Sequence, residues 1–242
     1  MSRRRILSVS ADSKTVKGEA FRYLTGISYL RPSPKLCPMS IKAQCLNACL
    51  FTAGRGAMNS VQLGRIRKTE LFFQNQALYM EYVVKDIKAL IKKARRMGFR
   101  VVVRLNGTSD ILWELIPVTI DGVTYPNIMS AFPDVQFMDY TKIASRFARS
   151  LPANYDLTFS YSGAPEFQGE VKKAIKYGAR IAVVFGDIIP DTFLGMPVVD
   201  GDSSDLRFLD PQGCIVALHA KGKAKKETGP FVVRLIPVAQ VA

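Results

Sequence analysis

Three of the four cysteines lie within thirteen positions of one another, in the stretch CPMSIKAQCLNACLFTAGRG at residues 37–56. Cys37, Cys45 and Cys49 have the spacing C-x7-C-x3-C, and a Gly-Arg-Gly turn follows them. Three thiolates from one loop can bind three irons of a 4Fe-4S cluster and leave the fourth iron open to a small ligand. The irregular, proline- and glycine-containing segment around these cysteines fits such a loop better than a packed helix or strand.

The cysteine spacing also allows two other interpretations. A structural zinc ion needs four ligands, and the remaining thiol, Cys214, is more than 160 residues further along the chain at the start of a predicted buried strand. Unligated cysteines are common in protein cores, so the three thiols can also be ordinary packing residues. The cysteines alone leave the cluster, the zinc site and the free thiols as alternatives.

Polar residues follow several apolar runs, at the points where predicted strands end. In parallel α/β folds the carboxyl ends of the strands meet at one edge, and ligands bind there. Polar strand ends also arise simply because loops and helix caps begin there. The sequence therefore predicts a ligand site drawn from a set that comprises Arg104, Asn106, Thr108, Ser109, Asp110, Asp139, Tyr140, Lys142, Ser160, Ser162, Asp200, Asp202, His219 and Lys221.

Several common catalytic motifs are missing from the chain. The sequence contains no GxxxxGK[ST], GxSxG, HExxH or GxGxxG segment, and His219 is its single histidine. A histidine-based zinc hydrolase or a multi-histidine metal centre is therefore improbable. The missing glycine fingerprint also weakens a dinucleotide-binding interpretation of the sheet.

The elements that would position these residues alternate between helix and strand. Helical spacing of apolar residues predicts a long helix from about residue 58 to Gly98, followed by a buried strand around residues 101–103. Shorter helices are expected at TKIASRFARSL and APEFQGEVKKAIKYG. About six parallel strands with crossover helices predict an α/β fold, either an open sheet or a partial (β/α)6 barrel. The further strands are expected at 135–142, 155–163, 179–187, 196–202 and 213–222.

Charge is distributed unevenly along the 242 residues. Residues 1–100 contain 20 Lys or Arg against 5 Asp or Glu, whereas residues 101–242 contain 14 against 15. A basic half favours a polyanionic or phosphate-bearing partner, although solvated cationic faces are an equal alternative. We expect a basic N-terminal extension at 1–20 and a single domain at 21–242. Without a signal peptide, a membrane span or a disulfide framework, a cytoplasmic protein is expected.

The segments CPMSIKAQCLNACLFTAGRG, RIRKTELFF, RLNGTSD and FMDYTK resemble a family of bacteriophage-encoded proteins that share this cysteine loop, over roughly residues 20–225. A phage origin would place the protein in the host-cell cytoplasm. More loosely, three close cysteines followed by β/α units resemble the radical S-adenosylmethionine enzymes. Those enzymes usually have C-x3-C-x2-C and an aromatic residue before the last cysteine, where this chain has Ala48.

The resemblance to radical enzymes implies a site and a reaction. Cys37, Cys45 and Cys49 would ligate a 4Fe-4S cluster whose open iron chelates S-adenosylmethionine, and the reduced cluster would release a 5′-deoxyadenosyl radical that abstracts hydrogen from a substrate. The protein would position the reactants and exclude water. The expected catalytic residues are Asp139, Tyr140 and Lys142. The expected cofactor-binding residues are Arg55, Arg104, Asn106, Thr108, Asp110, Ser160 and Ser162, the last two toward the substrate.

Two other functions stay open on the same residues. One is a non-catalytic iron-sulfur protein that binds nucleic acid through its basic half, including the RIRK run at 65–68 and the KGKAKK run at 221–226. The other is a protein that binds a small molecule at the open iron without radical chemistry.

Overall fold

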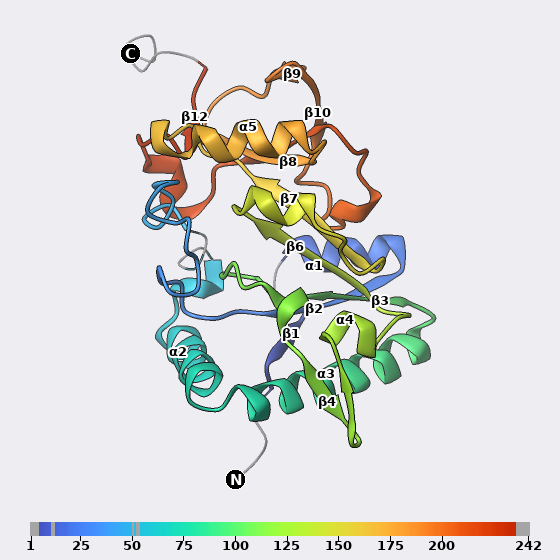
Figure 1. The fold of residues 1–242 in the computed structure, drawn as a ribbon. Coiled ribbons are helices and arrows are strands. Elements are labelled where there is room, and N and C mark those ends of the chain that lie inside the picture. Colours follow the sequence, from blue (N-terminus) through green and yellow to red (C-terminus); the bar gives the residue numbers. More distant parts are fainter. Residues whose placement is uncertain (1–4, 11–12, 50, 52–53, 236–242) are drawn as a thin grey trace.

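A computed structural model describes residues 5–10, 13–49, 51 and 54–235. The described chain is a mixed α/β structure built on one mostly parallel sheet with helices packed against it (Figure 1). The strand order is β1-β2-β3-β6-β7-β8-β11-β10-β9, and β12, which is not part of this order, pairs with β8. The strands are β1 (Leu7–Val9), β2 (Tyr23–Ser28), β3 (Arg100–Arg104), β6 (Gln136–Thr141), β7 (Tyr155–Ser160), β8 (Ile181–Phe185), β9 (Thr192–Phe193), β10 (Met196–Asp200), β11 (Ile215–His219) and β12 (Val232–Val233).

The predicted strands are confirmed, and each of them runs parallel to the other predicted strands beside it. Each pair from β2 through β3, β6, β7, β8, β11 and β10 is parallel. The short edge strands β1 and β9 are antiparallel to β2 and β10. The sheet is therefore open, with β1 and β9 at its edges, and it is mixed at those edges where the sequence predicted parallel strands throughout.

Residues 7–9 and 13–18 belong to this packed structure, although the sequence placed them in a basic extension. They form β1 and the helix α1 (Ser13–Gly18), and β1 pairs with β2 in a fixed register. The carboxylate of Asp86 accepts the backbone N–H groups of Ile6, at 2.6 Å, and Leu7, at 3.0 Å. A buried carboxylate thus fixes the start of the described chain against the long helix.

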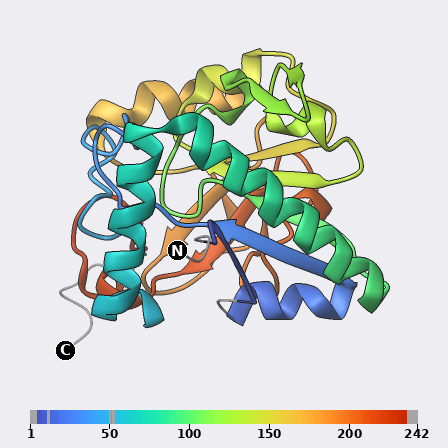
Figure 2. The same cartoon turned by 90° about the horizontal axis from the view of Figure 1, so that it is seen from below.

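The predicted helix from 58 to 98 is two helices, which meet at a sharp bend (Figure 2). The first is α2 (Asn59–Gln74) and the second is α3 (Gln76–Met97). Asn75 separates them because its side chain accepts the backbone N–H of Leu78 at 2.9 Å and so caps α3. Gly98 ends α3 as predicted, with a left-handed φ of 65° that glycine adopts without steric cost.

The remaining helices are short. They are α4 (Ile128–Ala131), α5 (Gln168–Lys176) and the 3-10 turns η1 (Glu19–Phe21), η3 (Gly54–Ala57), η4 (Trp113–Leu115), η5 (Ala144–Ala148), η6 (Pro165–Phe167), η7 (Arg207–Leu209) and η8 (Gly222–Lys226). The predicted helix TKIASRFARSL is only the 3-10 turn η5. A small hairpin, β4 (Val118–Ile120) and β5 (Val123–Tyr125), turns through Asp121 and Gly122, both with positive φ.

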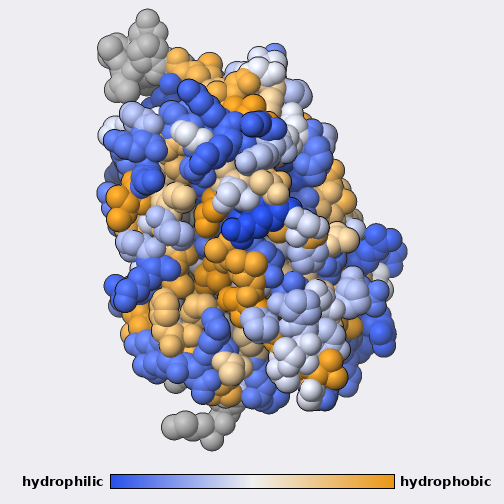
Figure 3. All heavy atoms as spheres, viewed as in Figure 1, coloured by the Kyte–Doolittle hydropathy of each residue, from blue (hydrophilic) through white to orange (hydrophobic). Residues whose placement is uncertain are grey.

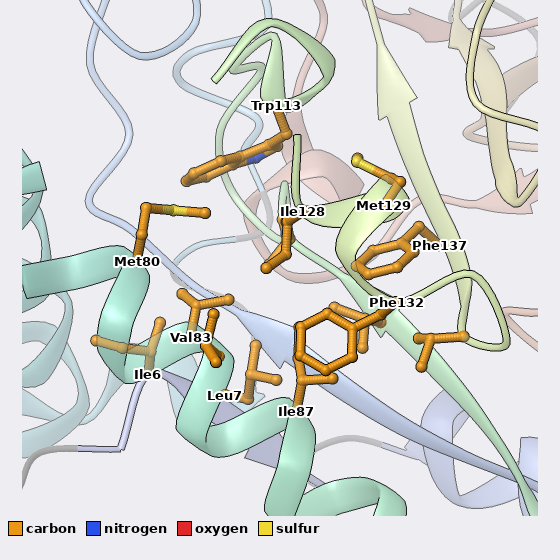
Figure 4. Close-up of a cluster of buried hydrophobic side chains, with 14 of the residues drawn as sticks. Ile6, Leu7, Met80, Val83, Ile87, Trp113, Ile128, Met129, Phe132 and Phe137 are labelled. Carbon is orange, nitrogen blue, oxygen red and sulfur yellow. The ribbon is translucent and has the colours of Figure 1, made fainter. Parts of the chain in front are cut away.

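The sheet buries apolar side chains on both faces. On one face α3 and α4 pack over the first strands: in Figure 4, Met80, Val83 and Ile87 of α3 point toward Ile128 and Phe132. The opposite face of the same strands packs against a loop segment that includes Leu206. One outer face of the molecule is mostly hydrophilic around a central apolar area (Figure 3). Burial on both faces explains why the strands read as continuous apolar runs.

Candidate functional site

The three clustered cysteines meet at the carboxyl edge of the sheet, on the loop between β2 and α2, which is blue at the left of Figure 1. The thiol of Cys37 lies 3.8 Å from the carbonyl oxygen of Thr108, just after β3. Burial, followed by the charges of Asp110, Cys49 and Cys45, raises the pKa of Cys37 to about 12. The three sulfurs are therefore near enough to act on one another's ionisation.

Side chains at the strand ends hold the cysteine loop in place. The hydroxyl of Thr108 donates to the carbonyl of Leu30 at 2.5 Å, and the hydroxyl of Ser162 donates to the carbonyl of Ala43 at 2.7 Å. The backbone N–H of Asp110 donates to the carbonyl of Leu36 at 2.8 Å. Thr108 and Ser162, predicted to touch a cofactor, thus contact the loop that carries the cysteines.

The last cysteine is held by a small apolar contact and by α2. Ala48 is 2% exposed and packs with Ala220 and Ala224, which lie before and within η8. The KGKAKK run, expected as a cationic surface, therefore also supplies a packing residue for the cysteine loop. The small side chain at position 48 suits this contact better than an aromatic ring would.

The first turns of α2 hold the exit of the loop. Gln62 donates to the carbonyl of Phe51 at 2.9 Å, and Arg65 donates to the same carbonyl. The Arg65 guanidinium is buried and lies 5.1 Å from the ring centre of Tyr29. Burial lowers the pKa of Arg65, whereas Tyr29 and Cys49 raise it. The sequence assigned Arg65 only to a basic run, and no local pattern signals its place beside a thiol.

All three thiols of the cysteine site act electrostatically on the ammonium of Lys142. Its ammonium donates to the carbonyl and hydroxyl oxygens of Ser160, both at 3.0 Å, and to the carbonyl of Tyr161 at 3.3 Å. Burial lowers the pKa of Lys142, while Cys45, Asp110, Cys49 and Cys37 oppose that shift. Lys142 and Ser160, both predicted site residues, are therefore brought together with the three thiols.

The pKa values of the three thiols bear on their use as metal ligands. Burial raises the pKa of Cys45 and of Cys49 as well as that of Cys37, so each must lose a proton to become a ligand. Within the described ranges, no group of three or more His, Cys, Asp or Glu side chains is placed so that it could hold a metal ion. Cluster ligands bind separate irons and are spaced more widely than the ligands of one ion. Three soft sulfur donors on one loop suit that arrangement.

Cys214 does not join the other cysteines. It precedes β11, whose five residues span about 16 Å, so it lies at the amino edge of the sheet while the cysteine loop lies at the carboxyl edge. Its side chain is 1% exposed and packs with Ala182 and Val216. The zinc site with Cys214 as a distant fourth ligand is therefore incompatible with the fold.

Asn106 and Asp139 form an internal network below the site. The Asp139 carboxylate accepts the backbone N–H of Asn106 at 2.7 Å and the hydroxyl of Tyr155 at 2.8 Å. The side-chain oxygen of Asn106 accepts the hydroxyl of Ser109 and the indole N–H of Trp113 at 2.8 and 3.0 Å. Asn106 is 2% exposed and Asp139 is 3% exposed, and their hydrogen bonds shape the loop after β3.

A buried arginine connects this network to the site. Arg146, fully buried on η5, donates to the Glu114 carboxylate at 3.0 and 2.7 Å and to Asp110 at 3.2 Å. It also donates to the hydroxyl of Tyr155 at 2.9 Å. The second oxygen of Asp110 accepts the backbone N–H of Lys142 at 2.8 Å. Sequence patterns singled out neither Arg146 nor Glu114. Arg146 lies 32 residues from Glu114 and 36 residues from Asp110 along the chain, so no local pattern links them.

Two more predicted residues lie on the opposite face of the sheet. Arg104 donates to Asp205 at 2.6 Å, and its guanidinium lies 4.7 Å from the ring centre of Tyr140. The hydroxyl of Tyr140 lies 3.4 Å from the other Asp205 oxygen. This side-chain cluster contacts the loop that carries Asp205. Asp205 was not predicted, and Arg55, on η3, is exposed at the outside of the cysteine loop.

The Asp202–His219 pair is a separate surface feature. His219 Nδ1 lies 2.9 Å from an Asp202 oxygen, and Lys221 donates to the other oxygen at 2.6 Å. The backbone N–H of Asp202 donates to Asp200 at 2.7 Å.

None of the helices in the described chain is both long and apolar enough to cross a membrane.

Replacing Arg146 should destabilise the protein strongly. In Arg146→Met the carboxylates of Asp110 and Glu114 lose their buried cation, so the free energy of unfolding should fall by about 3–5 kcal/mol in urea titrations. Arg149→Met removes an exposed arginine three residues away and should change it by less than about 0.5 kcal/mol. Equal losses in both variants would contradict the role given to Arg146.

Asp139 should make stability depend on pH. Burial raises its pKa from 3.8 to about 7, against opposing hydrogen bonds and Arg104. Between about pH 4 and 7 the unfolded chain releases this proton while the folded protein keeps it, so the free energy of unfolding should fall by up to about 1.4 kcal/mol per pH unit.

Asp139→Asn should remove this decline, as measured by urea titrations at pH 5, 6 and 8. The control Asp134→Asn changes an exposed carboxylate and should keep the wild-type pH profile. A decline that persists in Asp139→Asn would assign it to another group.

Comparison with known proteins adds one finding. The sequence model of a protein family described as gene product 88, a phage-type family, matches residues 4–234 of the chain. No curated protein and no solved structure matches the chain. The match agrees with the resemblance to phage proteins and says nothing of radical enzymes. Because it extends over nearly all of the 242 residues, the chain belongs to the gene product 88 family.

Proposed function

We propose that this protein binds a 4Fe-4S cluster through Cys37, Cys45 and Cys49. The observation that carries the proposal is the meeting of these thiols, from one loop, at the carboxyl edge of a parallel sheet beside the ammonium of Lys142. Soft sulfur donors select iron-sulfur clusters, and ligands of α/β sheets bind at this edge. Three protein ligands leave one iron for a small molecule.

S-adenosylmethionine is the ligand that we assign to the open iron, and a radical-type reaction is the activity. When bound and reduced, the cluster would supply the electron for cleavage of the ligand's sulfonium. The chain's own contribution is positional: Thr108 and Ser162 hold the loop, and Arg65 ties its exit to α2. Arg55 is an exposed cation beside the loop and is suited to the carboxylate of the ligand. We place the reaction in the cytoplasm of the host cell, where thiols stay reduced.

The geometry narrows the residues that can act on a substrate. Asp139 and Asn106 are enclosed by their mutual hydrogen bonds, and Arg104 and Tyr140 pair with Asp205 on the opposite face of the sheet. Their proposed contribution is therefore to the shape of the site. Residues next to the thiols, above all Lys142 and Ser160, form the proposed site wall.

Anaerobic purification tests the cluster. Wild-type protein should contain about four irons and four sulfides per chain with a broad absorption near ~400 nm, and a variant with Cys37, Cys45 and Cys49 changed to alanine should lose them. The matched control Cys214→Ala keeps the loop and should retain the iron. Colourless wild-type protein, or iron that survives in the triple variant, would contradict the proposal.

The loaded protein then allows the ligand to be tested. Incubation with S-adenosylmethionine and dithionite should yield 5′-deoxyadenosine from the wild type and none from the triple cysteine variant. A loaded protein that binds S-adenosylmethionine without cleaving it would keep the cluster and replace the radical activity by binding alone.

A nucleic-acid-binding function is the alternative, and one surface favours it. Lys85 and Lys88 on α3 pair with Glu81 and Asp121, whereas the last turns of the helix add four further exposed cations. These cations are Lys92, Lys93, Arg95 and Arg96. A cationic helix face can track phosphates without reading sequence.

Salt dependence tests this alternative. Binding of a labelled single-stranded oligonucleotide should weaken as salt rises. When Lys92, Lys93, Arg95 and Arg96 are changed to glutamine, the slope of the logarithm of the binding constant against the logarithm of the salt concentration should become shallower. The expected change is up to about 0.7 for each phosphate that is no longer neutralised. Lys172→Gln and Lys176→Gln on α5 serve as the control. Absence of binding at low salt would exclude this function.

A further inference from the structure

The three N–H groups of the Lys142 ammonium are all used within the fold. They donate to two oxygens of Ser160, at 3.0 Å each, and to the carbonyl of Tyr161 at 3.3 Å. An ammonium has three donors and no acceptor. A lysine that acts as a general acid, or that binds a substrate oxygen, needs a donor free for that purpose. The arrangement therefore speaks against either of these roles for Lys142, which the sequence placed among the catalytic residues.

Aromatic rings hold the same ammonium from the sides. Its nitrogen lies 4.7 Å from the ring centre of Phe231 and 5.4 Å from that of Phe167. Phe231 precedes β12 and Phe167 ends η6, so two separate segments converge on Lys142. Cation–π contacts stabilise a charge that has lost water. The fold thus fixes a positive charge at one position.

No carboxylate hydrogen-bonds to the Lys142 ammonium in the described part of the chain. Asp110 acts on it electrostatically, but the oxygens of Asp110 accept the backbone N–H of Lys142 and the guanidinium of Arg146. The other groups whose charges act on it are the thiols of Cys45, Cys49 and Cys37. A fixed cation beside three thiols is complementary to whatever negative charge those sulfurs hold.

We infer that Lys142 is a positioning residue that acts as a fixed positive charge and stabilises the reduced, more negative state of the cluster held by the three cysteines. The inference rests on the proposed function. In the step concerned, one electron passes from an external low-potential reductant to the oxidised cluster, and no bond forms or breaks. A nearby cation stabilises the reduced cluster more than the oxidised cluster, because the reduced cluster carries one more negative charge.

Reductive titration of the anaerobically loaded protein with dithionite and redox mediators, followed by electron paramagnetic resonance, tests the inference. Lys142→Met keeps the length of the side chain without its charge. Its equilibrium constant for one-electron reduction should fall at least tenfold, which is about 59 mV toward more negative potential. Lys142→Arg, which retains the charge, should stay within about threefold of the wild type.

Two further variants keep the result interpretable. Lys142→Gln retains a hydrogen-bond donor to Ser160, should show the same tenfold fall, and replaces Lys142→Met if that variant does not fold. Lys176→Met removes an exposed lysine from α5 and should leave the potential unchanged. Loaded Lys142→Met or Lys142→Gln with the wild-type potential overturns the inference while leaving the cluster in place. A wild-type protein without iron or sulfide overturns both the cluster and the inference.

Discussion

Asp110 links the parts of this protein that must meet for a site to exist. Its backbone N–H bonds the cysteine loop at Leu36, one carboxylate oxygen accepts the backbone of Lys142, and the other accepts the guanidinium of Arg146. These bonds join the loop after β2, the segment after β3 and the end of β6. Because Asp110 is largely buried, burial raises its pKa and Arg146 opposes the shift. The carboxylate is stable there only with its partners in place.

Several polar side chains at the strand ends form hydrogen bonds that hold the cysteine loop and the turn after β3. Thr108 and Ser162 satisfy backbone carbonyls of the cysteine loop, and Asn106 satisfies several groups of the turn after β3. An irregular loop exposes backbone polar groups that a helix or strand would pair internally. A long loop packed onto a sheet therefore needs side chains that replace those pairs. That need accounts for polar residues that sequence reasoning assigned to a cofactor.

Buried thiols and buried cations lie in the same region of this protein. Burial raises the pKa of all three thiols, so the sulfurs are neutral in the protein by itself, while Lys142 and Arg65 bring positive charge to the same region. A ligand set that releases protons on binding can supply the matching negative charge. Neighbouring Ala48 and Ala224 keep the contact between the loop and η8 small and apolar. The cations therefore lie near the thiols, whereas the alanine contact joins the cysteine loop to η8.

Local sequence patterns predicted the alternation of helices and strands and the parallel central strands, and the close spacing of three cysteines is visible in the sequence. Apolar runs such as Val101–Val103 identify buried strands because both faces of a covered sheet exclude water. The sequence did not reveal the break at Asn75 inside an otherwise helical pattern, where a side-chain cap starts a second helix.

Which polar residues meet depends on the tertiary structure. Alternate residues of a strand face opposite sides, so Asp139 points toward Tyr155 and its neighbour Tyr140 toward Asp205, although the two are adjacent in the chain. Strand order and register bring the partners of these side chains together across long stretches of sequence, and neither is encoded in local periodicity.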